Sequence, residues 1–155
     1  CASGSKEKSA ESETVKMASL PLPVQAAFKK AVGAGSIEKI EKETEDGKTI
    51  YEVSYEVEGE DRSIKVSDKG DVLEEDVEVK VKSLPPAVSG AVMAKYANAK
   101  IKDAERVSED GATYYELNIK VGKIERELKI DATGKILEDE DKSAEEDEKK
   151  ESAKK

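Results

Sequence analysis

The chain has 155 residues, of which 41% are charged and 36% hydrophobic, and its formal net charge is −9. It contains no histidine and one cysteine, so an internal disulfide is impossible and the commonest general base and metal ligand are missing. The chain has no basic patch, which argues against nucleic-acid binding, and it has no apolar run long enough to span a membrane.

Residues 1–18 are mostly small or charged, without apolar periodicity, and are predicted to form a disordered leash. The single cysteine is Cys1, followed by Ala2-Ser3-Gly4-Ser5. This arrangement resembles the start of a mature bacterial lipoprotein. The resemblance implies a lipid on Cys1 and anchoring in the cell envelope facing the periplasm, at the outer membrane if the host has two membranes. The alternative is a cysteine introduced for cloning or labelling.

Two copies of one sequence unit follow. Residues 19–74 align without a gap with residues 83–138 at an offset of 64, and 19 of the 56 aligned positions are identical. Chance would give only a few identities, so the pattern predicts duplication of a folded unit. The predicted organisation is a first repeat at 19–82, a second repeat at 83–141 and a charged C-terminal tail at 142–155.

Each copy is predicted to open with an amphipathic helix of about three turns, starting at a Leu-Pro pair because proline suits the first helical turn. The apolar face of the first helix consists of Leu20, Val24, Ala27, Phe28, Ala31 and Val32. The face of the second consists of Leu84, Val88, Ala91, Val92 and Tyr96. Glycines after the first helix and Asn98 after the second are the predicted ends.

Strand signals follow each helix. In the first copy they begin at residues 37–45, continue after an Asp-Gly turn through residues 51–57, and end in two shorter apolar pairs separated by turns. Alternation at Val77, Val79 and Val81 extends the last strand and joins the copies. The predicted fold class is α+β: a tandem repeat of a helix plus an antiparallel sheet of about four strands, with the helix packed on one sheet face.

The order and spacing of these elements resemble the PepSY-like family, which is related to the fold of a β-lactamase-inhibitory protein. The matching features are the Leu-Pro helix starts, the isoleucine of the first strand, the Asp-Gly turns, Tyr-Glu-Val at 51–53 with Tyr-Glu-Leu at 115–117, and the turns ending in Gly70 and Gly134. The resemblance implies an envelope protein without catalytic activity. The inhibitor's disulfides cannot form here, and its inhibitory hairpin residues have no counterpart in this chain.

Neither a catalytic residue nor a cofactor is expected. Acidic clusters at residues 68–76 and 138–141 supply oxygen ligands of the kind that calcium prefers, but they lack the Asp-x-Asp-x-Asp-Gly loop. We therefore expect solvated acidic faces and no metal site. Arg62 and Arg126 recur at equivalent positions and are predicted to lay their stems over the core and pair with a glutamate.

A candidate binding surface is expected on the polar face of the sheet. Side chains alternate between the two faces of a strand, and Tyr114 falls on the face opposite to the core tyrosines. Its counterpart Ile50 is also apolar. Glu52 and Glu116 are predicted to lie on the same face as Ile50 and Tyr114. Tyrosine suits binding surfaces because it buries area at low entropic cost.

The leading hypothesis is a non-enzymatic, lipid-anchored envelope protein whose repeats bind a protein or peptide. The alternatives are an inhibitor of a secreted peptidase or other hydrolase, and an envelope sensor of a small ligand or calcium.

Overall fold

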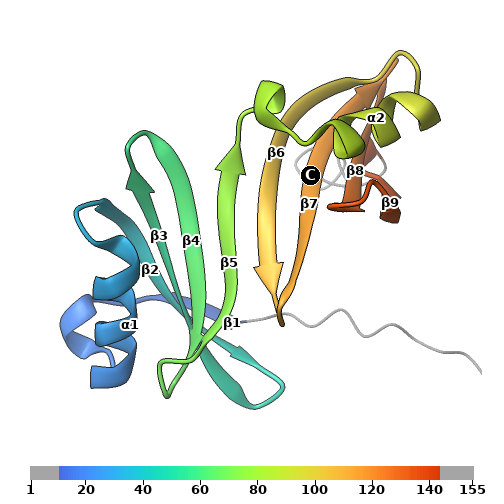
Figure 1. Ribbon diagram of the computed structural model, residues 1–155. Coiled ribbons are helices and arrows are strands. Elements are labelled where there is room, and N and C mark those ends of the chain that lie inside the picture. Colours follow the sequence, from blue (N-terminus) through green and yellow to red (C-terminus); the bar gives the residue numbers. More distant parts are fainter. Residues whose placement is uncertain (1–10, 144–155) are drawn as a thin grey trace, which may run out of the picture. The chain divides into compact units, whose positions relative to one another are not determined.

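The computed structural model describes residues 11–143 and contains two helices, two short 3-10 helices and nine strands within that range (Figure 1). The helices are α1 (Leu22–Val32) and α2 (Pro86–Lys95), and the 3-10 helices are η1 (Met17–Ser19) and η2 (Val81–Ser83). The strands are β1 (Glu11–Thr14), β2 (Ser36–Glu45), β3 (Lys48–Val57), β4 (Glu60–Ser67), β5 (Val72–Val79), β6 (Lys100–Glu109), β7 (Ala112–Val121), β8 (Ile124–Asp131) and β9 (Ile136–Asp141).

The chain divides into two compact units. Unit 1 ends at Glu75 and unit 2 begins at Asp76, so the division falls inside β5. The repeat boundary predicted at residues 82 and 83 stays a prediction. The predicted lipidation residue Cys1 and the tail beyond residue 143 lie outside the described residues.

Unit 1 packs α1 against one face of an antiparallel sheet (Figure 1). Strand β1 pairs with β2, β2 with β3, and β3 with β4. The hairpin between β2 and β3 is closed by Asp46 and Gly47, which both have positive φ angles, of 49° and 74°. These are the conformations of the tight type I′ turn, for which Asp-Gly is a preferred sequence. The Asp-Gly turn predicted from the sequence is therefore confirmed.

The core of unit 1 lies between α1 and the sheet. Because strand side chains alternate between faces, every second residue from Tyr51 to Tyr55 points at the helix. The buried residues of this core are Leu20, Val24, Phe28, Val32, Ile40, Tyr51, Val53, Tyr55, Ile64 and Val66.

Unit 2 repeats this plan with α2 on strands β6 to β9, which pair in sequence order and are antiparallel. Asp110 and Gly111 close its first hairpin with φ angles of 49° and 76°. Its core consists of Leu84, Val88, Val92, Ala104, Tyr115, Leu117, Ile119, Leu128 and Ile130. The α+β class and the packing of a helix on one sheet face are thus confirmed in both units.

The structure differs from the prediction in two respects: the number of strands, and the residue at which regular structure begins. Residues 11–14, Glu-Ser-Glu-Thr, form β1 and pair with β2, although the sequence assigned them to a disordered leash. All four are exposed, so no apolar alternation marks the strand, and its ladder of backbone hydrogen bonds carries no sequence signal. Val15 and Met17 then pack against the core of unit 1. Residues 11–143 therefore form nine strands and not a repeat of four-stranded sheets.

In each unit, one glycine lets a turn lie close to the helix. A Cβ atom on Gly70 would lie 2.6 Å from the Pro23 carbonyl oxygen, and one on Gly134 would lie 2.5 Å from the Ala87 oxygen. Both glycines also have positive φ, which costs other residues energy. This explains why glycine recurs at this position of the repeat. Within residues 11–143, neither helix has the length and apolar character needed to cross a membrane.

Candidate functional site

The sheet face opposite the helix, here called the open face, carries the residues predicted to bind. Since Tyr51 and Val53 point at α1, their neighbours Ile50 and Glu52 point away from it. Tyr114 and Glu116 take the same positions on β7 of unit 2. This alternation places each predicted pair on the open face of its own unit, and all four side chains are half-buried.

A row of four charged side chains crosses the open face of unit 1. Glu41 on β2 lies opposite Glu52 on β3, and Glu52 lies opposite Lys65 on β4. The Lys65 Nζ atom is 3.9 Å from the Glu74 carboxylate on β5. Cross-strand neighbours of this kind interact directly through their side chains.

The same row recurs in unit 2 at the offset of 64 residues. Glu105, Glu116, Lys129 and Glu138 lie opposite one another on β6 to β9. Lys129 Nζ is 3.8 Å from Glu116 and 3.6 Å from Glu138. We call these two sets the charged rows; each has three carboxylates and one lysine, so each carries an excess of negative charge.

Partial burial perturbs the central carboxylate of each row. The pKa of Glu52 is raised, chiefly because burial disfavours the charged form, and the carboxylates of Glu43 and Glu41 add to this, whereas Lys65 opposes it. The pKa of Glu116 is raised for the same first reason, again against the influence of Lys129. Each row therefore holds a carboxylate whose charge is only partly compensated by its own unit.

Apolar side chains flank the rows. In unit 2 the Lys129 ammonium lies 4.6 Å from the centre of the Tyr114 ring, and the Tyr114 hydroxyl donates to Glu109 across 3.2 Å. In unit 1 Ile50 lines a depression of about 690 Å³ between two turns, together with Leu73, which is 37% exposed. The open face thus offers apolar contact area beside negative charge in both units.

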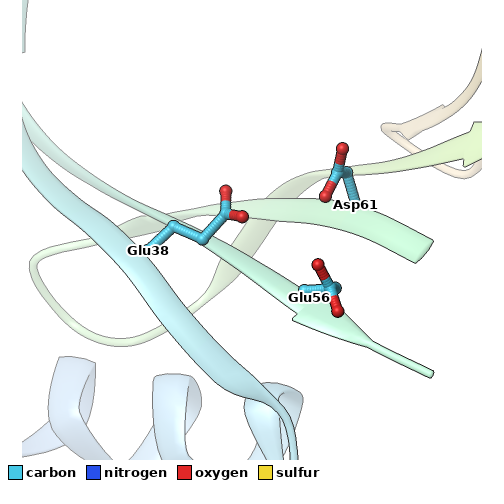
Figure 2. A group of neighbouring side chains, drawn as sticks. All are labelled: Glu38, Glu56 and Asp61. Carbon is cyan, nitrogen blue, oxygen red and sulfur yellow. The ribbon is translucent and has the colours of Figure 1, made fainter. Parts of the chain in front are cut away.

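Two groups of carboxylates within the described residues are close enough to share a cation, and both are in unit 1. Figure 2 shows the exposed group, in which the Glu38, Glu56 and Asp61 side chains converge from β2, β3 and β4. The second group is Glu41, Glu43 and Glu52.

Neither group is repeated in unit 2. The counterparts of the group in Figure 2 are Lys102, Lys120 and Glu125, and Lys102 forms a 2.7 Å ion pair with Glu125. The counterpart of Glu43 is Val107. Calcium takes six to eight oxygen ligands, so three carboxylates supply only part of a site.

The acidic clusters predicted at residues 68–76 and 138–141 form neither of these groups. Asp139 instead accepts hydrogen bonds from Arg126, Tyr96 and Lys95. The prediction that both arginines pair with a glutamate is confirmed for Arg62, which bonds Glu60 at 2.8 Å, whereas Arg126 pairs with two aspartates.

The outer members of the charged rows were not predicted from the sequence. Glu41, Lys65 and Glu74, with their counterparts in unit 2, were not among the predicted binding residues. Their signal was present in the repeat, because all three positions are identical between copies although they point away from the core. Identity at exposed positions of a diverged repeat is the pattern that would have found them.

Comparisons with other proteins agree with this architecture. The model of a family described as "Putative beta-lactamase-inhibitor-like, PepSY-like" matches residues 6–74 and residues 54–138. No curated protein matches the chain significantly.

Several solved structures are similar over most of the chain. A DUF2874 family protein from Bacteroides uniformis is 17% identical with a TM-score of 0.66, over 79% of this chain and 89% of that one. A "putative periplasmic" protein from Bacteroides eggerthii is 14% identical with a TM-score of 0.68, over 81% and 91%. A BLIP-like protein from Bacteroides fragilis is 20% identical with a TM-score of 0.63, over 79% and 86%. At these identities the likeness shows the shared fold.

Proposed function

Because the chain belongs to the PepSY-like, beta-lactamase-inhibitor-like family, we propose that it is a non-enzymatic protein of the cell envelope that binds a protein or peptide. The observation that carries this proposal is the recurrence of the charged row on the open face of both units. These side chains contribute nothing to either core. Their identity between two otherwise diverged copies therefore favours a role at the surface.

The chemistry of the rows indicates the partner's contacting surface. Each row has two carboxylates more than it has lysines, so it favours arginine or lysine side chains that donate charge-assisted hydrogen bonds. Ile50 and Tyr114 lie beside the rows and would supply apolar contact area. The partner is thus a basic segment with apolar residues, and its association rate should fall as salt is added.

Location and chemistry complete the proposal. The description of the similar Bacteroides eggerthii protein as periplasmic supports an envelope location. The lipid on Cys1 remains a prediction that intact mass spectrometry of membrane-derived protein would test. The chain's lack of histidine removes the commonest general base, which supports a binding role over catalysis.

The test is affinity capture from envelope extracts with three baits. The wild type is compared with a double variant, Glu52→Lys with Glu116→Lys, and with a control, Glu11→Lys with Glu58→Lys, that makes the same change in net charge at exposed positions outside the rows. We expect a partner captured by the wild type and the control and lost from the first variant. Equal capture by all three baits would contradict the proposal.

Inhibition of a secreted hydrolase is the second candidate, supported by the family's description. It requires a tight, stoichiometric complex. Titration of the purified protein into assays of β-lactamases and secreted peptidases would show a sharp equivalence point if the candidate is right, and no effect on rate if it is wrong.

Calcium binding is a third candidate, supported by the convergence of Glu38, Glu56 and Asp61 (Figure 2). A cation that binds only the folded state raises the melting temperature. Calcium should then raise it beyond a magnesium control in the wild type, and Glu56→Gln should remove the difference. If calcium does not change the melting temperature, this candidate is excluded.

A further inference from the structure

The two units differ at the end of the helix, where unit 2 completes a cluster that unit 1 leaves incomplete. In unit 2 the chain leaves α2 at Tyr96, whose ring centre lies 5.6 Å from the guanidinium carbon of Arg126. The Tyr96 hydroxyl donates to Asp139 Oδ2 across 2.6 Å, and Arg126 Nε donates to Asp139 Oδ1 across 2.7 Å. One carboxylate thus accepts from both the phenol and the arginine, and we call this arrangement the Tyr–Arg–Asp cluster.

Unit 1 keeps the arginine and a carboxylate but lacks the ring. Arg62 takes the position of Arg126 and Glu75 that of Asp139, whereas Val32 stands where unit 2 has Tyr96. Val32 is buried in the core of unit 1. Arg62 Nε is buried and has no hydrogen-bond partner among the described residues, although the guanidinium reaches Glu60 through another nitrogen. An unmade hydrogen bond at a buried donor is costly, so this site is incomplete as it stands.

A pocket lies beside Arg62 and Glu75, the counterparts of the two residues that contact the Tyr96 ring and hydroxyl in unit 2. Its volume is about 350 Å³, and its lining includes Ala27, Ala31, Tyr55, Arg62, Val72 and Glu75. This is at the lower end of the range of about 300–1,000 Å³ in which proteins bind small organic groups. Val72 is 58% exposed here, whereas its counterpart Ile136 packs against the core of unit 2. The pocket therefore combines open apolar surface with an unsatisfied donor and an exposed carboxylate.

We propose that this pocket of unit 1 binds a tyrosine side chain supplied by a partner protein. The ring stacks on the Arg62 guanidinium and covers Ala27, Ala31 and Val72, as a tyrosine and an arginine pair in unit 2. Its hydroxyl donates to Glu75. The ring also excludes water from around Arg62 and Glu75, which strengthens the attraction between their charges and favours a turn of the Glu75 side chain toward the buried Nε atom. Binding thus rebuilds the Tyr–Arg–Asp cluster with glutamate as the acceptor.

This site is separate from the open face. The pocket is lined by α1 and by the sheet face that α1 covers, whereas the charged rows lie on the opposite face. The inference consequently does not depend on the binding proposed for the open faces, and either can fail alone.

The test is an NMR titration of the full chain with N-acetyl-L-tyrosinamide. We expect saturable shifts of the Ala27, Ala31 and Val72 methyl signals and of the Arg62 Nε–H signal, with a dissociation constant in the millimolar range that suits so small a ligand. The corresponding signals of unit 2, from Ala91, Ile136 and Arg126, should not move. N-acetyl-L-phenylalaninamide should bind roughly fivefold more weakly because it lacks the hydroxyl.

Matched variants make the result specific. Ala31→Leu fills the pocket without removing a polar group and should abolish the shifts, whereas Ala26→Leu, at an exposed position of α1 outside the pocket, should leave them unchanged. Tyr96→Ala removes the ring from unit 2 and should create a second set of shifts around Arg126. The proposal is overturned by the absence of saturable shifts in the wild type, by shifts that persist in Ala31→Leu, or by equal affinity for the tyrosine and phenylalanine probes.

Discussion

Arg126 donates from Nε to Oδ1 of Asp139 across 2.7 Å, and this pair joins β8 to β9 in unit 2. Burial alone would raise the pKa of Asp139, but the hydrogen bonds from Lys95, Tyr96 and Arg126 outweigh it and lower the pKa to about 2. The charged carboxylate is therefore a source of stability for unit 2.

Asp139→Asn should reduce the free energy of unfolding at pH 7 by about 2 kcal/mol, because the lowered pKa favours the folded state. A lowered pKa contributes stability that is present above the unfolded value near 3.8 and is lost as the pH falls through about 2. Urea denaturation at several pH values would show the wild type and the variant converging at low pH. Glu75→Gln, at the equivalent position of unit 1, is the control and should change little. A constant difference at all pH values would contradict this account.

The carboxylates in Figure 2 should repel one another, since Glu56 lies directly opposite Asp61. Like charges at opposed strand positions are destabilising, and opposite charges stabilise by about 0.2–1 kcal/mol. Glu56→Lys copies the residue of unit 2 and should raise stability by about 0.5 kcal/mol, while the reverse change Lys120→Glu should lower it. Thermal melts at low and high salt would check both, because salt should shrink both differences. A destabilised Glu56→Lys would show that repulsion is not the controlling effect.

Gly134→Ala should be strongly destabilising. The new methyl group would lie 2.5 Å from the Ala87 oxygen, and the φ angle of 91° suits glycine alone. We expect a loss of more than about 1 kcal/mol. Gly90→Ala is the matched control: it lies within α2 with open space around it, and alanine there should add up to about 1 kcal/mol through helix propensity. Chemical denaturation of both variants measures the contrast, and equal effects would refute it.

Much of the fold follows from local sequence signals. The alternation around Tyr51 and Tyr115 and the Asp-Gly turns predicted the central strands and hairpins, because these features depend on neighbouring residues. Strand β1 was missed because its side chains are all exposed and only its backbone pairs. Tyr96 was predicted as part of a helix face, yet it contacts Asp139, 43 residues further along the chain. Contacts between residues so far apart in the chain leave no pattern within a single segment. For the same reason the sequence could not predict that unit 1 lacks the tyrosine of the Tyr–Arg–Asp cluster beside Arg62.

The central carboxylates of the charged rows should lower stability at neutral pH. Burial raises the pKa of Glu52 and Glu116, so the folded state disfavours their ionised forms. A raised pKa lowers stability as the pH rises from the ordinary value of 4.5 through the raised one. The double variant Glu52→Gln with Glu116→Gln should therefore melt at a higher temperature than the wild type at pH 7 and at a similar temperature at pH 3. A lower melting temperature at pH 7 would contradict this.

Affinity capture with that same double variant tests the central claim most directly. If the charged rows are retained for binding, the variant should be at least as stable as the wild type and yet fail to capture the envelope protein that the wild type captures. Groups whose removal stabilises a protein but reduces its function are typical of functional sites. If the variant captures the same protein in the same amount, the carboxylates of the charged rows have no role in binding, and the open faces are not the binding site.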